Sequence, residues 1–148
     1  MAIVRTAGTE IIRAHHFEAV NSTAQNMIYG VQHHIYTVLS IIVQAQALNA
    51  TGDYIGCRID GYDSKAGTSA ESIFIFQQDM SVGQTFVWND MFSMNGFEPA
   101  DFSGAMNAAD DQDAIADQGG AVQILQIYGE HSSDNFDVSI TFIDQNNA

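Results

Sequence analysis

Residues 136–144 read FDVSITFID, and this run carries the clearest sign of a fold class in the sequence. Its apolar residues take every second position, at Phe136, Val138, Ile140 and Phe142. Polar residues fill the places between them, at Asp137, Ser139 and Thr141. Because neighbouring side chains of a β-strand point to opposite faces, the alternation predicts a strand with one face in a core. We expect the four apolar residues of this run, together with Trp88, to be buried between two sheets.

The same alternation recurs along the chain, in segments dense in Thr, Val, Ile, Phe and Tyr. It predicts eight strands, at residues 10–20, 27–36, 37–47, 53–60, 71–78, 84–93, 121–129 and 136–144. One long bent strand from Met27 to Ala47 is an alternative to the second and third, because no glycine or proline marks a turn near Tyr36. Polar spacers predict the turns, at NATG (49–52), SKAGTSA (64–70), SVGQ (81–84), MNG (94–96) and HSSDN (131–135). Closely spaced strands without helical periods predict an all-β fold, a jelly-roll-like antiparallel β-sandwich with two sheets of four strands.

Residues 97–120, FEPADFSGAMNAADDQDAIADQGG, break this rhythm as one long acidic loop. The segment holds the only proline of the chain, six acidic residues and no basic residue. Loops of this length are uncommon in compact domains, so we expect either an insertion with a short helical turn or contacts outside the subunit. Its carboxylates are a candidate set of cation ligands for calcium, at Asp110, Asp111, Asp113 and Asp117. Their spacing does not match an EF-hand, and a solvated acidic loop is the other reading.

The length of 148 residues predicts one domain. We expect an N-terminal arm at residues 1–9, whose apolar AIV reaches a neighbouring subunit, and a single β-sandwich domain at residues 10–148. Four basic residues oppose eighteen acidic ones, which gives a formal net charge of −14. A surface this negative repels phosphate groups, so we expect neither nucleic acid nor an anionic membrane as a partner. It favours solubility and self-repulsion, or a basic partner surface.

Two histidine doublets, at His15–His16 and His33–His34, raise the question of a metal site. Neighbours in a strand point to opposite faces, so neither doublet can chelate one ion. The chain has no His-x-His pair of the kind that holds metal in jelly-roll enzymes. His16 and Glu18 share a face, but no third ligand is visible. We therefore expect no metal, with one histidine of each doublet facing the core or a neighbouring subunit and the other facing solvent.

No catalytic or cofactor-binding motif is present: the chain lacks G-x-S-x-G, a phosphate-binding loop and G-x-G-x-x-G. The single cysteine, Cys57, excludes an internal disulfide, and we expect it to pack as a small apolar residue. Trp88 with Phe86 and Phe92 could form a sugar-stacking platform, but an aromatic stripe at strand spacing is more often core.

The order of the segments resembles that of a known family. A long apolar stretch, HHIYTVLSIIVQAQALNATGDYIGCRIDGYD (33–63), precedes IFIFQQDMSVGQTFVWND (73–90), in which a polar turn at Gly83 separates two strands. MFSMNG (91–96) then leads to a late strand pair that closes at DVSITFID (137–144). Over about residues 27–96 and 121–144, this arrangement resembles the small β-sandwich virion accessory proteins of tailed bacteriophages. The segment 97–120 departs from the pattern.

The resemblance implies a non-enzymatic virion protein, in the first place a capsid decoration or cement subunit that binds the assembled shell and stabilises it. Such a subunit is made in the host cytoplasm and lies on the outer capsid surface. Its partners are the major capsid protein or another virion protein, together with copies of itself in a trimer. The family implies no catalytic residue and no cofactor. An alternative is a tail or appendage β-sandwich module that binds host-surface glycan, and a jelly-roll enzyme is a third candidate.

Overall fold

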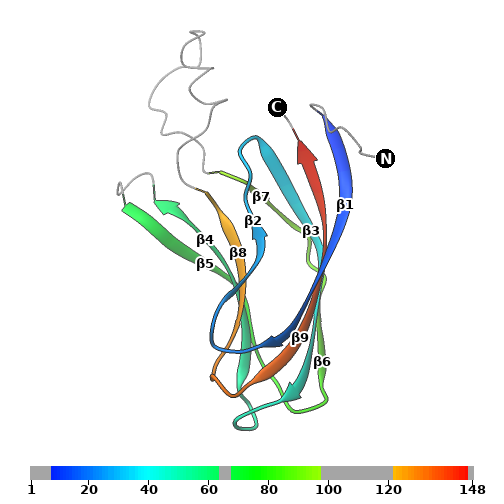
Figure 1. Ribbon diagram of the computed structural model, residues 1–148, viewed down its shortest axis with the longest axis vertical. Coiled ribbons are helices and arrows are strands. Elements are labelled where there is room, and N and C mark those ends of the chain that lie inside the picture. The colour runs from blue at the N-terminus through cyan, green and yellow to red at the C-terminus, as the bar shows by residue number, and fades with distance from the viewer. Residues whose placement is uncertain (1–7, 64–67, 98–121, 147–148) are drawn as a thin grey trace.

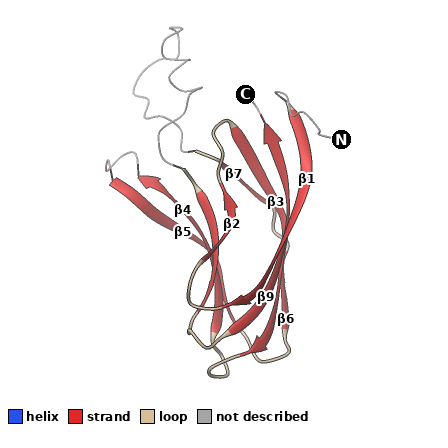
Figure 2. Cartoon of the chain, in the orientation of Figure 1, coloured by secondary structure: helices blue, strands red, loops and turns tan. Residues whose placement is uncertain are grey.

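The computed structural model describes residues 8–63, 68–97 and 122–146, and within these ranges the chain is built of β-strands (Figures 1 and 2). The strands are β1 (Thr9–Val20), β2 (Gln25–Tyr29), β3 (His34–Ala47), β4 (Tyr54–Asp63), β5 (Thr68–Asp79), β6 (Thr85–Trp88), β7 (Phe92–Asn95), β8 (Ile124–Gly129) and β9 (Asn135–Asn146). No helix in the described part of the chain is long and apolar enough to cross a membrane.

The strands form two antiparallel sheets that face each other. Sheet A has the order β1-β9-β3-β6, with β7 also paired to β3, and sheet B has the order β2-β8-β4-β5. Because β6 and β7 follow one another along the same edge of β3, they act as one interrupted strand. With that pair counted once, each sheet has four strands, and consecutive strands lie in different sheets except in the β4–β5 hairpin. This is the strand order of a jelly roll, and the predicted all-β, two-sheet sandwich is confirmed.

The core lies between the sheets and centres on β9, which pairs with β1 on one side and β3 on the other. Its predicted inward residues are all fully or almost fully buried: Phe136, Val138, Ile140 and Phe142. Sheet B covers them with Leu125 and Ile127 of β8 and with Ile55 and Cys57 of β4. Trp88 is only half-buried at the margin of this core, where its ring stacks on Phe76 at 5.4 Å between centroids. Its predicted burial is therefore confirmed only in part.

A bulge in β3 changes which side of the strand faces the core. The buried residues have even numbers in its first part and odd numbers in its second: Tyr36, Val38, Ile41, Val43 and Ala45. The change occurs because Leu39 is an extra residue opposite β9, where Val38 pairs with Phe142 and Ser40 pairs with Thr141. In the sequence, such a change of phase looks like a strand boundary. The prediction of two strands at 27–36 and 37–47 is therefore wrong, and so is the alternative of one long strand from Met27 to Ala47. The chain breaks instead at a turn at residues 30–33.

That turn depends on close contact between two glycines. A Cβ atom on Gly30 would overlap the carbonyl oxygen of Gly96, and one on Gly96 would overlap the backbone of Val31. The backbone amide of Gly30 donates a hydrogen bond to the carbonyl of Gln123 at 2.9 Å.

The predicted turn at MNG is wrong, because Met94 and Asn95 belong to β7 and only Gly96 lies beyond it.

The strand predicted at 84–93 is interrupted. β6 pairs with residues 41–44 of β3, and β7 pairs with residues 35–38. Between them, residues 89–91 bulge away opposite Leu39 and Ser40, and Met91 is 67% exposed. Asp90, which breaks the apolar alternation in the sequence, marks the place.

One buried carboxylate joins two of the predicted turns. Asp134 is 4% exposed and accepts hydrogen bonds from the backbone amides of Asn49 at 2.9 Å and His131 at 2.8 Å. The turns after β3 and after β8 are thereby held together at the lower end of the sandwich in Figure 1. Of the predicted turn at 64–70, residues 64–67 lie outside the described residues and the rest belong to β5.

Candidate functional site

The structure separates the members of each histidine doublet. On β1, His15 points inward and His16 is exposed, as predicted. His34 begins β3 and has a side chain that is 15% exposed, whereas His33 lies in the preceding turn with a φ of 67°. The second doublet therefore does not lie within one strand, contrary to expectation. Among the described residues, no three or more His, Cys, Asp or Glu side chains come together to hold a metal ion.

A buried charged cluster joins three strands of sheet A. Asp144 of β9 is 1% exposed, and its Oδ2 lies 3.2 Å from Nη1 of Arg13 on β1. Its Oδ1 lies 2.7 Å from Nδ1 of His34 on β3. Burying a carboxylate is costly unless it is paired, and these two partners stabilise it. The cluster lies at one end of the space between the sheets.

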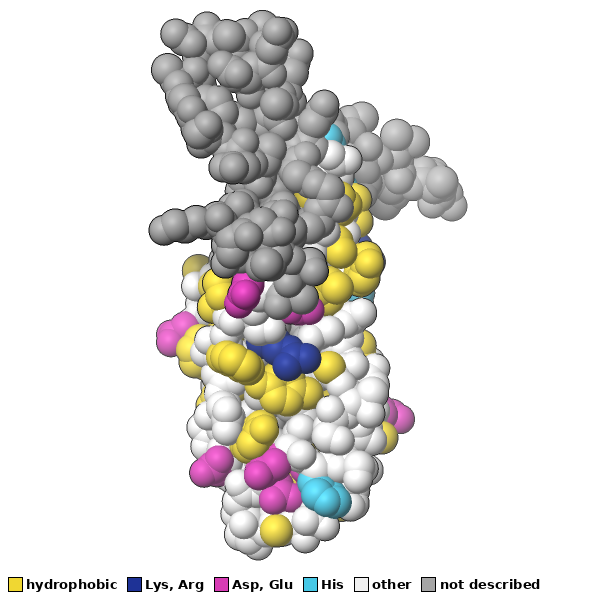
Figure 3. Space-filling view, turned by 90° about the vertical axis from the view of Figure 1, so that its left-hand side faces the viewer, with side chains coloured by type: hydrophobic (Ala, Val, Ile, Leu, Met, Phe, Trp, Pro, Cys, Tyr) yellow, Lys and Arg dark blue, Asp and Glu magenta, His cyan; other side chains and the backbone are white. Residues whose placement is uncertain are grey.

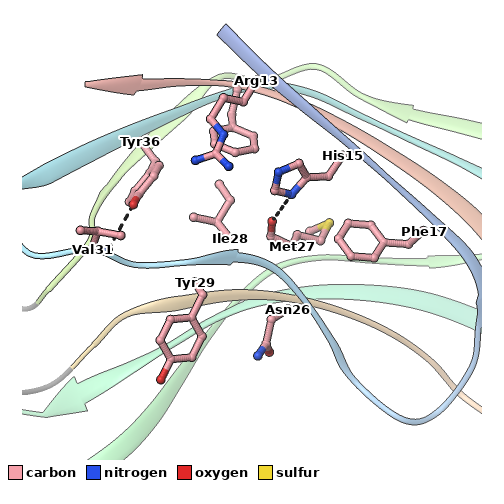
Figure 4. Close-up of a pocket in the computed structure, with 10 residues that line it drawn as sticks. Arg13, His15, Phe17, Asn26, Met27, Ile28, Tyr29, Val31 and Tyr36 are labelled. Carbon is pink, nitrogen blue, oxygen red and sulfur yellow. Dashed lines mark hydrogen bonds between the residues drawn. The ribbon is translucent and has the colours of Figure 1, made fainter. Parts of the chain in front are cut away.

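Beside this cluster, a cavity of about 390 Å³ opens between β1 of sheet A and β2 of sheet B (Figure 4). It is lined by Arg13, His15, Phe17, Asn26, Met27, Ile28, Tyr29, Val31, Tyr36 and Phe142. In Figure 4 the side chains of Arg13, His15 and Tyr36 point into the space from sheet A, and Ile28 faces them from β2. The side chains of Asn26 and Tyr29 point away from it. The volume falls at the small end of the range for ligand sites in proteins, about 300–1,000 Å³.

The polar groups of the cavity are held in fixed positions. Nδ1 of His15 lies 3.2 Å from the carbonyl oxygen of Met27, which can only accept, so this nitrogen carries the proton. The Phe142 ring supports both polar side chains: the His15 ring lies edge-on at 5.4 Å, and Cζ of Arg13 lies 5.9 Å from the Phe142 centroid. The hydroxyl of Tyr36 accepts a hydrogen bond from the Val31 amide at 3.1 Å. An apolar space with a few oriented polar groups is the general form of a small-molecule site.

A second surface of interest is the outer face of sheet B. Cζ of Arg58 lies 4.8 Å from the centroid of the Tyr128 ring, and its Nε donates to Oε1 of Gln126 at 3.0 Å. Phe74 pairs with Arg58 across the strands and is 61% exposed. Figure 3, which views this side of the molecule, shows a basic group among hydrophobic side chains. Tyr54 meets the Tyr128 ring edge-on at 6.3 Å, so this arginine–aromatic face is largely pre-organised.

The outer face of sheet A is different, because its central rows carry no Lys, Arg, Asp or Glu. One row runs Ile12, Ile143, Thr37 and Ser93 across β1, β9, β3 and β7. Another runs His16, Ser139, Ile42 and Val87 across β1, β9, β3 and β6. Ala14 and Thr141 lie between the two rows. We call these ten outward side chains the uncharged face; Ile12 is 72%, Ile42 42% and Val87 50% exposed.

Cys57 packs as the sequence predicts. It is fully buried in β4, and burial raises the pKa of its thiol from 9.0 to about 12. A neutral thiol at this position is a core group and a poor nucleophile.

The raised pKa predicts an alkaline loss of stability. Below pH 9 the thiol is protonated in both the folded and the unfolded chain, so it contributes no pH dependence. Between about pH 9 and 12 only the unfolded chain loses the proton, and the free energy of unfolding should fall by about 1.4 kcal/mol per pH unit on this account. Denaturant unfolding of the wild type and of Cys57→Ala across this range isolates the effect. Parallel pH profiles for the two proteins would contradict it.

Other predicted site residues fall elsewhere. Trp88 stacks on Phe76 of the opposite sheet and forms no exposed platform with Phe86 and Phe92, which are themselves half-buried against the core. Glu18 is exposed on β1, as is His16. The candidate cation ligands Asp110, Asp111, Asp113 and Asp117 lie outside the described residues, as do residues 1–7 of the predicted arm.

The sequence pattern did not single out the buried ion cluster or the arginine–aromatic face. The sequence does contain a signal for the buried ion cluster. Asp144 follows Phe142 by two residues and so continues the inward set Phe136 to Phe142, which places its carboxylate in the core. The second depended on cross-strand register, which places Gln126 opposite Arg58 and Tyr128 opposite Gly56.

No protein-family model matches the chain, and no curated protein matches it in sequence. Three solved structures have a similar course of the chain. A protein of Bacillus endospore appendages, which form disulfide-linked pili, shares 12% identity over 100% of this chain and 97% of its own length, with a TM-score of 0.43. A protein of infectious bursal disease virus Gx strain shares 8% identity over 97% of this chain and 34% of its own length, with a TM-score of 0.48. A protein of the T13 particle of that virus shares 7% identity over 99% and 37%, with a TM-score of 0.41.

This chain spans about a third of the length of the viral proteins. The similar structures come from a bacterial appendage and from viral particles. At these identities and TM-scores, the likenesses do not assign the chain to a family or give it a function.

Proposed function

We propose that the chain is a non-enzymatic structural subunit of a tailed-phage virion, a capsid decoration or cement protein that binds the assembled shell. It acts by mass action: a subunit that binds the assembled shell and not its free parts stabilises the assembled state. The partner is the major capsid protein or another virion protein, and the chain associates with copies of itself as a trimer on the outer capsid surface.

The uncharged face carries this proposal. The whole chain has a formal net charge of −14, yet two rows of four side chains across sheet A carry no Lys, Arg, Asp or Glu. Depletion of charge at the centre of a surface patch is typical of protein interfaces. The patch lies on paired strands, and the Thr37 and Ser93 hydroxyls are 3.0 Å apart across two of them, so its backbone is held in place.

The acidic remainder of the surface and the N-terminal segment complete the proposal. Like charge on neighbouring copies opposes crowding on a shell, so basic groups of the shell or salt must offset it. We infer that residues before β1, which begins at Thr9, reach a neighbouring subunit as an arm. The carboxylates at 110–117 are in this account either cation ligands or contacts to a basic patch.

A charge placed in the uncharged face tests the docking surface. Ile42→Glu should weaken binding to purified shells of the encoding phage by roughly tenfold or more, since docking would bury an unpaired carboxylate. Val82→Glu introduces the same carboxylate at a position 63% exposed in the β5–β6 turn and should bind like the wild type. Co-sedimentation with shells gives both affinities. Equal losses for the two variants, or none, would rule out the face, and a wild type that does not sediment with shells would rule out the decoration role.

A second candidate function is a tail or appendage module that binds host-surface glycan. The arginine–aromatic face favours it, because Tyr54, Tyr128 and Arg58 offer ring faces and donors in fixed positions. In that case Tyr128→Ala should abolish binding on a glycan array, whereas Ile42→Glu should leave it unchanged.

A further inference from the structure

We infer that the cavity between β1 and β2 binds a small amphipathic anion, namely an alkyl chain that ends in one carboxylate. The inference is separate from the docking role, because the cavity lies between the sheets and the uncharged face lies on the outside of sheet A.

The walls of the cavity require an apolar body. Phe142 and Met27 are each 1% exposed, Tyr36 is 2% and Ile28 is 3% exposed, and they face one another across the space. Val31 at the rim remains 49% exposed. Contact with an alkyl chain would remove this apolar surface from water. A volume of about 390 Å³ suits a chain shorter than that of a membrane lipid.

One cationic side chain, that of Arg13, determines that the ligand is an anion. The guanidinium of Arg13 has five N–H donors, and its one described ion pair is the contact of Nη1 with Asp144. Its side chain is 45% exposed and points into the cavity in Figure 4. Asp144 and the Phe142 ring hold the guanidinium in place, so little entropy is lost when an anion binds. A carboxylate is the group that a guanidinium binds through two parallel hydrogen bonds.

His15 restricts the ligand further. Its Nδ1 proton is directed to the Met27 carbonyl, so the ring cannot rotate freely. The ring lies beside Arg13 on the same face of β1, and both lie on Phe142. The charged end of the ligand is therefore expected at Arg13, and its chain along His15 and Phe17 toward β2.

Titration with decanoate tests the inference, with decanol as the uncharged ligand of equal chain length and acetate as the head group alone. Decanoate should bind saturably, one molecule per chain, and shift the amide resonances of residues 13–17 and 26–31. The affinities of decanol and of acetate should each be lower than that of decanoate by roughly tenfold or more. Decanol binding equal to decanoate would overturn the anionic part of the proposal.

Matched variants locate the site. Val31→Trp fills the rim and should weaken decanoate binding by roughly tenfold, while Val82→Trp, at the exposed turn far from the cavity, should not. Both positions are exposed, so both proteins should fold. Arg13→Lys keeps a positive charge opposite Asp144 but loses the paired N–H donors of the guanidinium, so this variant should also bind decanoate more weakly. Equal binding by the two tryptophan variants, resonance shifts elsewhere, or no saturation would overturn the proposal.

Discussion

Ile140→Ala should lower the free energy of unfolding by roughly 2–5 kcal/mol, because it removes three buried carbons at the centre of the core. Ile140 is fully buried on β9, where its backbone pairs with His15 on one side and Ile41 on the other. The neighbouring strand β3 is also paired with β6 and β7, so the structure around the space left by the substitution can collapse only in part. Denaturant unfolding gives the loss as a lower midpoint with an unchanged slope.

Ile12→Ala is the matched control. Ile12 lies on β1 and is 72% exposed, so the same truncation there should cost less than about 0.5 kcal/mol. A loss below 1 kcal/mol for Ile140 would mean that the register of β9 is wrong, since a slip of one residue turns the whole inward set outward.

Arg13→Met should lower the free energy of unfolding by about 2–3 kcal/mol, since it takes one cationic partner from the buried carboxylate of Asp144. Removing one partner of a fully buried pair costs about 3–5 kcal/mol, and the loss here is smaller because the Arg13 side chain is 45% exposed. The double variant Arg13→Met/Asp144→Ala should recover part of the loss, because it also removes the carboxylate that Arg13→Met leaves with one cationic partner fewer.

Asp144→Ala alone should cost less than Arg13→Met. Its removal leaves Arg13 able to turn its guanidinium to water, whereas Asp144 at 1% exposure has no such route. The four proteins form a double-mutant cycle measured by denaturant unfolding. A more stable Arg13→Met than Asp144→Ala would contradict the assignment of the buried charge to Asp144.

Much of the fold follows from alternation in the sequence. FDVSITFID gives the inward face of β9 without error, and the turns at NATG, SVGQ and HSSDN lie where polar residues and glycine gather. Alternation gives a wrong strand boundary where a strand changes phase. The bulge at Leu39 makes β3 look like two strands in the sequence, whereas the chain turns between β2 and β3 at Gly30. A bulge depends on the partner strand, which a local pattern does not contain.

The candidate sites were less predictable for the same reason. Asp144 could have been placed in the core by extending the phase of β9 by one step. Its partners Arg13 and His34 could not, because they lie 131 and 110 residues away and meet it only through the pairing of three strands. The uncharged face likewise becomes visible only when the outward positions of five strands are placed side by side.

We propose that the chain lies on the outer surface of an assembled particle. Electron microscopy of purified, intact particles of the encoding phage, labelled with a gold-conjugated antibody to this chain, shows whether it does. We expect label over the outer surface of the capsid, in numbers that fall when Ile42→Glu replaces the wild-type gene. Label confined to tails, or particles without label while the chain remains in the unassembled fraction, would contradict it.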